Sequence, residues 1–276
     1  MARVLVVGWL GFAFAATASS LGRAEDAVAP EPPATVDGLI APTLSGPWRT
    51  RVALHGWLIN WLHVSIDTPE EKDSTTKELG WILGKLDWML PIDVETRKGS
   101  FGAYVHTLAF SLDGEIRTGP ADIEWNDEGF LMDLGISYEL ARWTLGSGQR
   151  APTLTLEPFA GARLFYDPVD IDLSRLGRDT TADFTNYVPV LGLRAFFDLT
   201  EHWNVRIEGD YGGFGVDDNH QTWQVLGLVG YRWPGWGVDW NLQVGYRAMR
   251  IFDLRQSGTD IELDARGADV VLAVEF

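Results

Sequence analysis

The chain has 276 residues, with 39 Asp and Glu against 22 Lys and Arg, which gives a formal net charge of −17 at pH 7. This length allows one or two domains. The acidic balance argues against a nucleic-acid-binding surface, because such a surface needs a basic stripe to displace counterions from phosphates. There is no cysteine, which excludes a disulfide framework, a thiolate metal site and a cysteine nucleophile.

Residues 1–24 have the pattern of a secretory signal peptide: Arg3 precedes an apolar run from Val4 to Ala16, and small and polar residues follow. The run of about 13 residues is too short to cross a bilayer as a helix, although an N-terminal anchor helix is the alternative. Residues 25–47 hold five prolines and predict a flexible lead-in. The exported domain is therefore expected to span residues 48–276.

The last residues alternate with period two, which points successive side chains to opposite faces of a strand. Val270, Leu272, Val274 and Phe276 share one face. A closing strand that ends in Phe276 resembles the C-terminal signal of bacterial outer-membrane β-barrel proteins, which the barrel-assembly machinery recognises. No apolar run beyond the leader approaches 18 residues, so membrane insertion would have to use strands.

Ten segments with period two lie between turn signals and predict an even number of antiparallel strands, as single-chain bacterial barrels require. They are Thr50 to Ser65, Trp88 to Thr96, Phe101 to Ser111, Ile123 to Leu140, Leu154 to Asp170, Tyr187 to Leu199, Trp203 to Gly213, Thr222 to Trp233, Trp240 to Leu254 and Ile261 to Phe276. Tight turns alternate with long polar connections, which places the turns on the periplasmic side and the long loops outside.

The long connections are predicted to be loops at residues 66–87, 112–122, 171–186 and 214–221, and residues 141–153 form an unusually long periplasmic link. Within the first loop, Thr75 and Glu78 have the spacing of a capping box, and the apolar residues from Leu79 to Leu86 have helical spacing. We expect a short amphipathic helix there, which either plugs the lumen or packs beneath the loops.

Trp223 and Trp233 lie ten residues apart on one face of a predicted strand. At about 3.3 Å per residue and about 40° of tilt, they are separated by roughly 25 Å along the membrane normal, the height of an apolar band between two aromatic girdles. A soluble sandwich is the alternative way to place two such tryptophans.

A Gly-x-Arg repeat recurs in the predicted strands at Gly161, Gly192, Gly230 and Gly245. An arginine that faces lipid costs about 2–4 kcal/mol at the bilayer midplane, so these arginines and the carboxylates of the same parity are expected to face the lumen and to pair there. The predicted lumen residues are Arg163, Arg194, Arg206, Arg232, Arg247, Glu157, Glu208, Asp210, Asp269 and Glu275. They form either a structural ion-pair ladder or a selectivity ring for a permeating solute.

Several of these motifs together resemble a poorly characterised family of bacterial outer-membrane β-barrel proteins. The resemblance is carried by the glycine-rich run from Gly209 to Gly215, by Trp223-Gln224, by the Gly-Tyr-Arg repeats and by Phe276. It covers most of residues 48–276 and implies the fold, but it brings no activity or catalytic residue.

Catalytic and metal motifs find no support in the spacing of the sequence. His55, His63, His106, His202 and His220 are scattered, and neither an HExxH motif nor a Gly-x-Ser-x-Gly elbow occurs, so no metal, cofactor or catalytic residue is expected. The alternative is an outer-leaflet lipid hydrolase that uses His220 near Asp217 and Asp218. A solvated loop that binds divalent cations together with lipopolysaccharide explains the same three residues.

Together these patterns predict an all-β, transmembrane, antiparallel up-and-down barrel of about ten strands in the outer membrane. We expect a monomer with a charge-filled lumen and a structural or narrow-solute passage role, surrounded by outer-membrane lipid and lipopolysaccharide. The alternatives are an open diffusion pore, the lipid hydrolase and a soluble periplasmic ligand-binding barrel.

Overall fold

The computed structural model describes residues 39–40, 46–67, 72–118, 121–147, 151–173, 178–215, 221–256 and 259–276. The chain divides into two compact units, residues 1–33 and 34–276. The predicted signal peptide and the first of these units lie outside the described residues.

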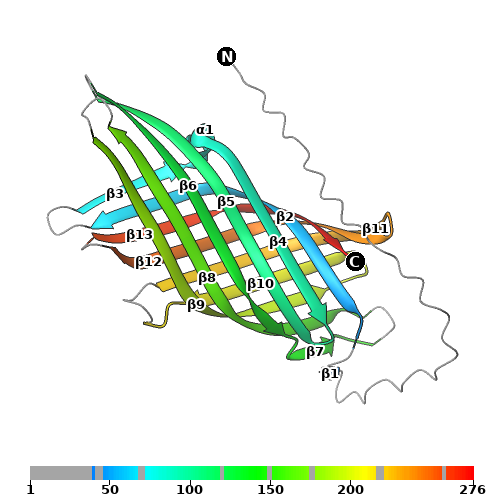
Figure 1. Cartoon of the computed structure of the whole chain (residues 1–276). Helices are drawn as coiled ribbons and strands as arrows, with labels where there is room; N and C mark the ends of the chain where they lie inside the picture. Colours follow the sequence, from blue (N-terminus) through cyan, green and yellow to red (C-terminus); the bar gives the residue numbers. More distant parts are fainter. Residues whose placement is uncertain are drawn as a thin grey trace, which may run out of the picture. The chain divides into compact units, whose positions relative to one another are not determined.

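Ten long strands form the wall of the second unit, and their antiparallel pairing follows chain order (Figure 1). They are β2 (Trp48–Asp67), β4 (Leu86–Lys98), β5 (Phe101–Thr118), β6 (Ala121–Tyr138), β8 (Thr153–Leu173), β9 (Arg178–Asp198), β10 (Trp203–Gly212), β11 (Gln221–Gly235), β12 (Val238–Gln256) and β13 (Thr259–Glu275). The wall closes where β13 pairs with β2, from Arg51 opposite Glu275 to Asp67 opposite Asp260. The prediction of a closed ten-stranded up-and-down barrel is confirmed.

Two predicted external loops are wrong, because the strands run on through them. β5 and β6 continue to Thr118 and Ala121, and β8 and β9 continue to Leu173 and Arg178. The backbone ladder persists along these extensions. The sequence of these extensions is polar at most positions. The strand prediction depended on alternating apolar and polar residues, and that alternation is lost there, although the backbone hydrogen bonds continue.

Three short strands complete the sheet: β1 (Leu39–Ile40), β3 (Lys72–Glu78) and β7 (Ala141–Thr144). β1, inside the predicted lead-in, pairs with β7. β7 corrects the predicted link at 141–153, because it continues the line of β6 and pairs with β8. Ser137 opposes Phe159 and Ala141 opposes Leu156, so the β6–β7 segment carries one extra residue, as a β-bulge does.

The helix predicted in the first external loop is confirmed as α1 (Leu79–Lys85). Its predicted capping box is wrong. Thr75 belongs to β3 and pairs with Val64 of β2, and Glu78 makes no side-chain hydrogen bond to the helix end. Among the residues that the structure describes, no helix is long and apolar enough to span a membrane.

The outward face of the barrel carries large apolar side chains that are exposed over most of its circumference. Examples are Leu54, Leu90, Val105, Ile136, Leu191, Ile207, Val225, Val244 and Leu272. Such a continuous apolar surface is not tolerated in water, so the soluble periplasmic barrel is excluded. A closed barrel leaves no unpaired strand edge in lipid, and together with this apolar belt it identifies a transmembrane barrel of the outer membrane.

Aromatic side chains gather near both ends of the outward face. At the tight-turn end, Trp233 stacks against Tyr231 and Trp240, with ring centroids 6.4 Å and 6.5 Å apart. Near the other end, Trp223 opposes Tyr211 in the β10–β11 ladder. The two tryptophans singled out in the sequence therefore lie on the same face, towards opposite ends of β11.

Candidate functional site

Many inward-facing side chains of the ten strands are charged, especially towards the tight turns. Apolar side chains fill part of the lumen beyond them. β10 illustrates the alternation, since Asn204, Arg206, Glu208 and Asp210 are buried while the residues between them are less so. Glycines between these side chains allow neighbouring strands and aromatic side chains to approach the backbone closely. A Cβ on Gly161, for example, would lie 2.8 Å from the hydroxyl of Tyr104.

Arg163 of β8 makes four hydrogen bonds inside the barrel. Its Nε and Nη2 donate to the two carboxylate oxygens of Asp133, at 2.8 and 2.7 Å, which is the bidentate arrangement. Nη2 also donates to Asp210 at 3.1 Å, and Nη1 donates to Thr222 Oγ1 at 2.8 Å. Four strands, β6, β8, β10 and β11, are thereby joined through one side chain.

A second group of charges crosses the lumen. Arg206 of β10 donates from Nη2 to Glu208 at 2.7 Å and to Glu95 of β4 at 2.8 Å. β4 and β10 are five places apart around the ten-stranded wall, so this bond joins opposite sides of the barrel. Arg194 donates from Nε to Glu208 at 2.9 Å and from Nη1 to Glu157 at 3.4 Å. We call this group the crossing network, defined by Glu95, Glu157, Arg194, Arg206 and Glu208.

Aromatic rings pack against two of these guanidinium groups. The guanidinium carbon of Arg194 lies 4.5 Å from the ring centre of Tyr104 and 4.4 Å from that of Phe159. Arg247 lies 5.4 Å from the ring centre of Trp57. Such cation–π contacts strengthen when water is excluded, and they restrict the orientations that the arginines can adopt.

Arg247 belongs to a third chain of contacts along β12, β13, β2 and β4. Its Nε donates to Asp269 at 2.8 Å, and its Nη2 lies 3.0 Å from His55 Nδ1. His55 Nε2 lies 2.5 Å from the carboxylate of Asp93. His55 is thus held between an arginine and two carboxylates.

Within the described part of the chain, one group of three side chains has the geometry to hold a metal ion. Donor atoms of Asp93, Glu95 and His106 lie within 4.8 Å of one another. Spacing along the chain could not indicate this group, because its members come from β4 and β5 and meet through the ladder, where Asp93 opposes His106. Arg206 already donates to Glu95 at 2.8 Å and competes with any cation for that carboxylate.

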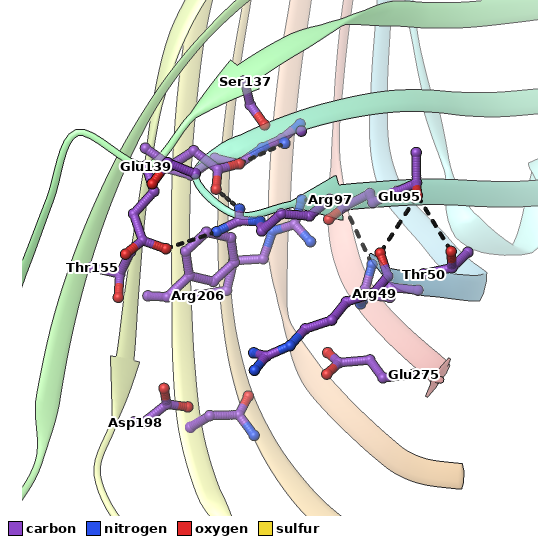
Figure 2. Close-up of a pocket in the computed structure, with 18 of the residues that line it drawn as sticks. Arg49, Thr50, Glu95, Arg97, Ser137, Glu139, Thr155, Asp198, Arg206 and Glu275 are labelled. Atoms are coloured by element: carbon purple, nitrogen blue, oxygen red, sulfur yellow. Dashed lines mark hydrogen bonds and ion pairs between the residues drawn. The ribbon is translucent and has the colours of Figure 1, made fainter. Parts of the chain in front are cut away.

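A cavity of about 380 Å³ occupies the tight-turn end of the lumen, and we call it the vestibule. Turn residues Gly99 and Ser100 and the strand-end residue Glu275 line its wall, and the crossing network forms its inner end. Figure 2 shows Arg97, Arg206 and Glu95 reaching into this space.

Beyond the crossing network, an apolar cluster fills part of the lumen. Trp57, Leu131, Met249, Ile251 and Ala265 are buried together, and partly buried apolar side chains pack against them. They come from β2, β6, β12 and β13, and β6 and β12 are opposite strands of the wall. We call this group the apolar cluster.

The predicted lumen residues meet in part. The structure joins Arg163 with Asp210, Arg194 with Glu157 and Glu208, Arg206 with Glu208, and Arg247 with Asp269. Arg232 instead pairs with Asp198 at 3.4 Å near the turns, and Glu275 lines the vestibule.

Sequence reasoning missed Asp133, Glu95, Asp93, His55 and His106 as members of this interior. For β4 the signal was present: Asp93, Glu95 and Arg97 alternate with apolar Ile92 and Val94. The same parity rule that selected the arginines selects these residues as well.

Comparisons with known proteins give matches of fold only. No protein-family model and no curated protein matches the chain. Ail, the attachment invasion locus protein of Yersinia pestis, is 8% identical with a TM-score of 0.35, covering 81% of this chain and 98% of its own. The translocator domain of the autotransporter NalP from Neisseria meningitidis is 11% identical with a TM-score of 0.35, covering 82% and 87%. Neisserial surface protein A is 9% identical with a TM-score of 0.27, covering 82% and 96%. At these scores the likenesses carry no argument about what the chain does.

Proposed function

We propose that this outer-membrane barrel has a structural role and that its lumen does not conduct. The observation that carries the proposal is the bond between Arg206 and Glu95, which joins opposite walls at 2.8 Å. Ten strands enclose an interior only slightly wider than that of eight-stranded barrels, which side chains fill. Long charged side chains from opposite walls therefore meet, and a solute would have to break their pairing to pass.

The apolar cluster supports the same proposal independently. It forms a second barrier of a different kind, since hydrated ions do not cross a constriction of buried apolar side chains without losing water. A narrow-solute passage role would require both barriers to open. Outer-membrane lipid and lipopolysaccharide are the proposed surroundings of the apolar belt, with the barrel as a monomer.

A catalytic role is not part of this proposal. The lipid-hydrolase alternative depends on Asp217, Asp218 and His220, which lie outside the described residues. Lipid turnover by the refolded protein in vesicles would decide that alternative.

Conductance of the refolded protein in planar lipid bilayers tests the proposal. We expect the wild-type barrel to show no steady current. Trp57→Ala combined with Arg206→Ala should admit a small conductance, because Trp57 belongs to the apolar cluster and Arg206 makes the bond that crosses the lumen to Glu95. Arg250→Ala is the matched control, since Arg250 is also an arginine paired with a carboxylate, Glu262, but on the outward face. A large, steady wild-type conductance would replace this proposal with the diffusion pore.

A further inference from the structure

Three arginines that line the vestibule each have a buried N–H group that makes no hydrogen bond within the described part of the chain. These groups are Nε of Arg142, Nη2 of Arg194 and Nε of Arg232. They come from β7, β9 and β11 and so lie on different parts of the wall. A buried donor without an acceptor is costly, and more so when it is charged, so three in one cavity call for an acceptor.

Two carboxylates of the wall are already shared between arginines. Glu139 accepts from Arg97 at 3.1 Å and from Arg142 at 2.8 Å. Glu157 is paired with both Arg97 and Arg194. Each of these carboxylates therefore serves two arginines, and rearranging them would free one donor only by exposing another.

The charge balance of the vestibule points in the same direction. Seven arginines line it against five carboxylates, and Glu208, which pairs with two of these arginines at the inner end, is a sixth, so one positive charge is in excess in a chain whose formal net charge is −17. A cavity with one sign of charge and low-dielectric walls concentrates solutes of the opposite sign. This excess favours anions over cations inside the vestibule.

We propose that the vestibule binds a small organic anion, through carboxylate or phosphate groups, from the periplasmic end of the barrel. The volume of about 380 Å³ suits a metabolite-sized ligand. Guanidinium groups present paired N–H donors that match the oxygens of carboxylates and phosphates. Arg194 supplies a donor deep in the cavity, and Arg142 and Arg232 supply donors nearer the turns.

This inference goes beyond the structural role proposed above, because a barrel can be closed with or without a ligand at one end. The two are also tested separately. A barrel that conducts but still binds an anion overturns only the proposed function, and a silent barrel that binds none overturns only this inference.

Isothermal titration of the refolded full barrel domain, in uncharged detergent at low ionic strength, tests the proposal with citrate and inorganic phosphate as probes. We expect one saturable site for at least one probe. A carboxylate site takes citrate in preference, and a phosphate site takes phosphate. Weaker binding at higher salt should follow, since the site is electrostatic.

Substitutions locate the site. Arg232→Gln and Arg142→Gln should each weaken binding about tenfold or more, because each removes a charge-assisted hydrogen-bond donor. Arg250→Gln, an arginine of the opposite end and outer face, should bind as the wild type does. The proposal is overturned if neither probe binds the wild type saturably, or if Arg250→Gln loses affinity as much as the two vestibule variants.

Discussion

Replacing Arg163 by methionine should be strongly destabilising. The Arg163 side chain is 2% exposed and donates to Asp133 twice, to Asp210 and to Thr222. Methionine preserves much of the volume but leaves the two carboxylates facing each other without a cation. Removing one partner of a buried pair costs about 3–5 kcal/mol, most of it from the charge left behind. We therefore expect the free energy of unfolding to fall by about that amount.

Arg250→Met provides a control that differs chiefly in burial. Arg250 and Glu262 lie 2.8 Å apart, close to the 2.7 Å of Arg163 and Asp133, but their side chains are 41% and 42% exposed. Exposed pairs contribute about 0–1 kcal/mol, so the control should be nearly neutral. Denaturant unfolding of barrels refolded into lipid vesicles, followed by tryptophan fluorescence, measures both variants.

A second substitution distinguishes lost pairing from lost packing. Adding Asp210→Asn to Arg163→Met removes one of the unpaired charges and should recover part of the lost stability. Equal loss in Arg163→Met and Arg250→Met, or no recovery in the double variant, would refute the reasoning that buried charge pairing governs the stability of the lumen.

Three further predictions concern the wall, assembly and orientation of the barrel. Gly245→Ala should lower stability by about 1–3 kcal/mol, because its Cβ would overlap the carbonyl oxygen of Gly227, whereas Gly227→Ala meets nothing within 4 Å and serves as the control in the same unfolding assay. Phe276→Ser should reduce the folded amount in cells but leave refolding in detergent nearly intact, since its side chain is 65% exposed; equal loss in both settings would mean that the residue only packs. In intact cells an impermeant thiol reagent should label Asp218→Cys and not Gly235→Cys, and the reverse result would invert the topology.

The strand pattern could be predicted from the sequence because a membrane barrel imposes one constraint everywhere: lipid on one face and lumen on the other. Val225 and Gln224, for example, differ in polarity because they face different solvents. In segments where this constraint does not apply, the prediction of strand boundaries failed. The extensions to Thr118 and Leu173 lack the alternation, and the spacing of Thr75 and Glu78 predicts a capping box where the structure has the strand β3.

The lumen could be predicted only as a set of side chains and not as a set of contacts. Parity assigns Arg206 to the inner face, but only closure of the wall brings it to Glu95 on the opposite strand. The unpaired donors of the vestibule could not be predicted from the sequence for the same reason. They depend on how many arginines share each carboxylate, as Arg97 and Arg142 share Glu139. Such sharing is a property of the assembled barrel and has no trace in local sequence.

The seam between β2 and β13 has a consequence for how the barrel forms. Every other neighbouring pair in the wall consists of long strands that follow each other in the chain, with β3 and α1 between β2 and β4 and with β7 between β6 and β8. The seam instead unites the first and last long strands, down to the backbone hydrogen bonds between Thr50 and Phe276. Contacts between such distant segments close the largest loop and form slowly. Until they do, the sheet has two free edges, which lipid does not accept and other chains can pair with. Loss of β13 should therefore produce an aggregating open sheet and not a nine-stranded barrel.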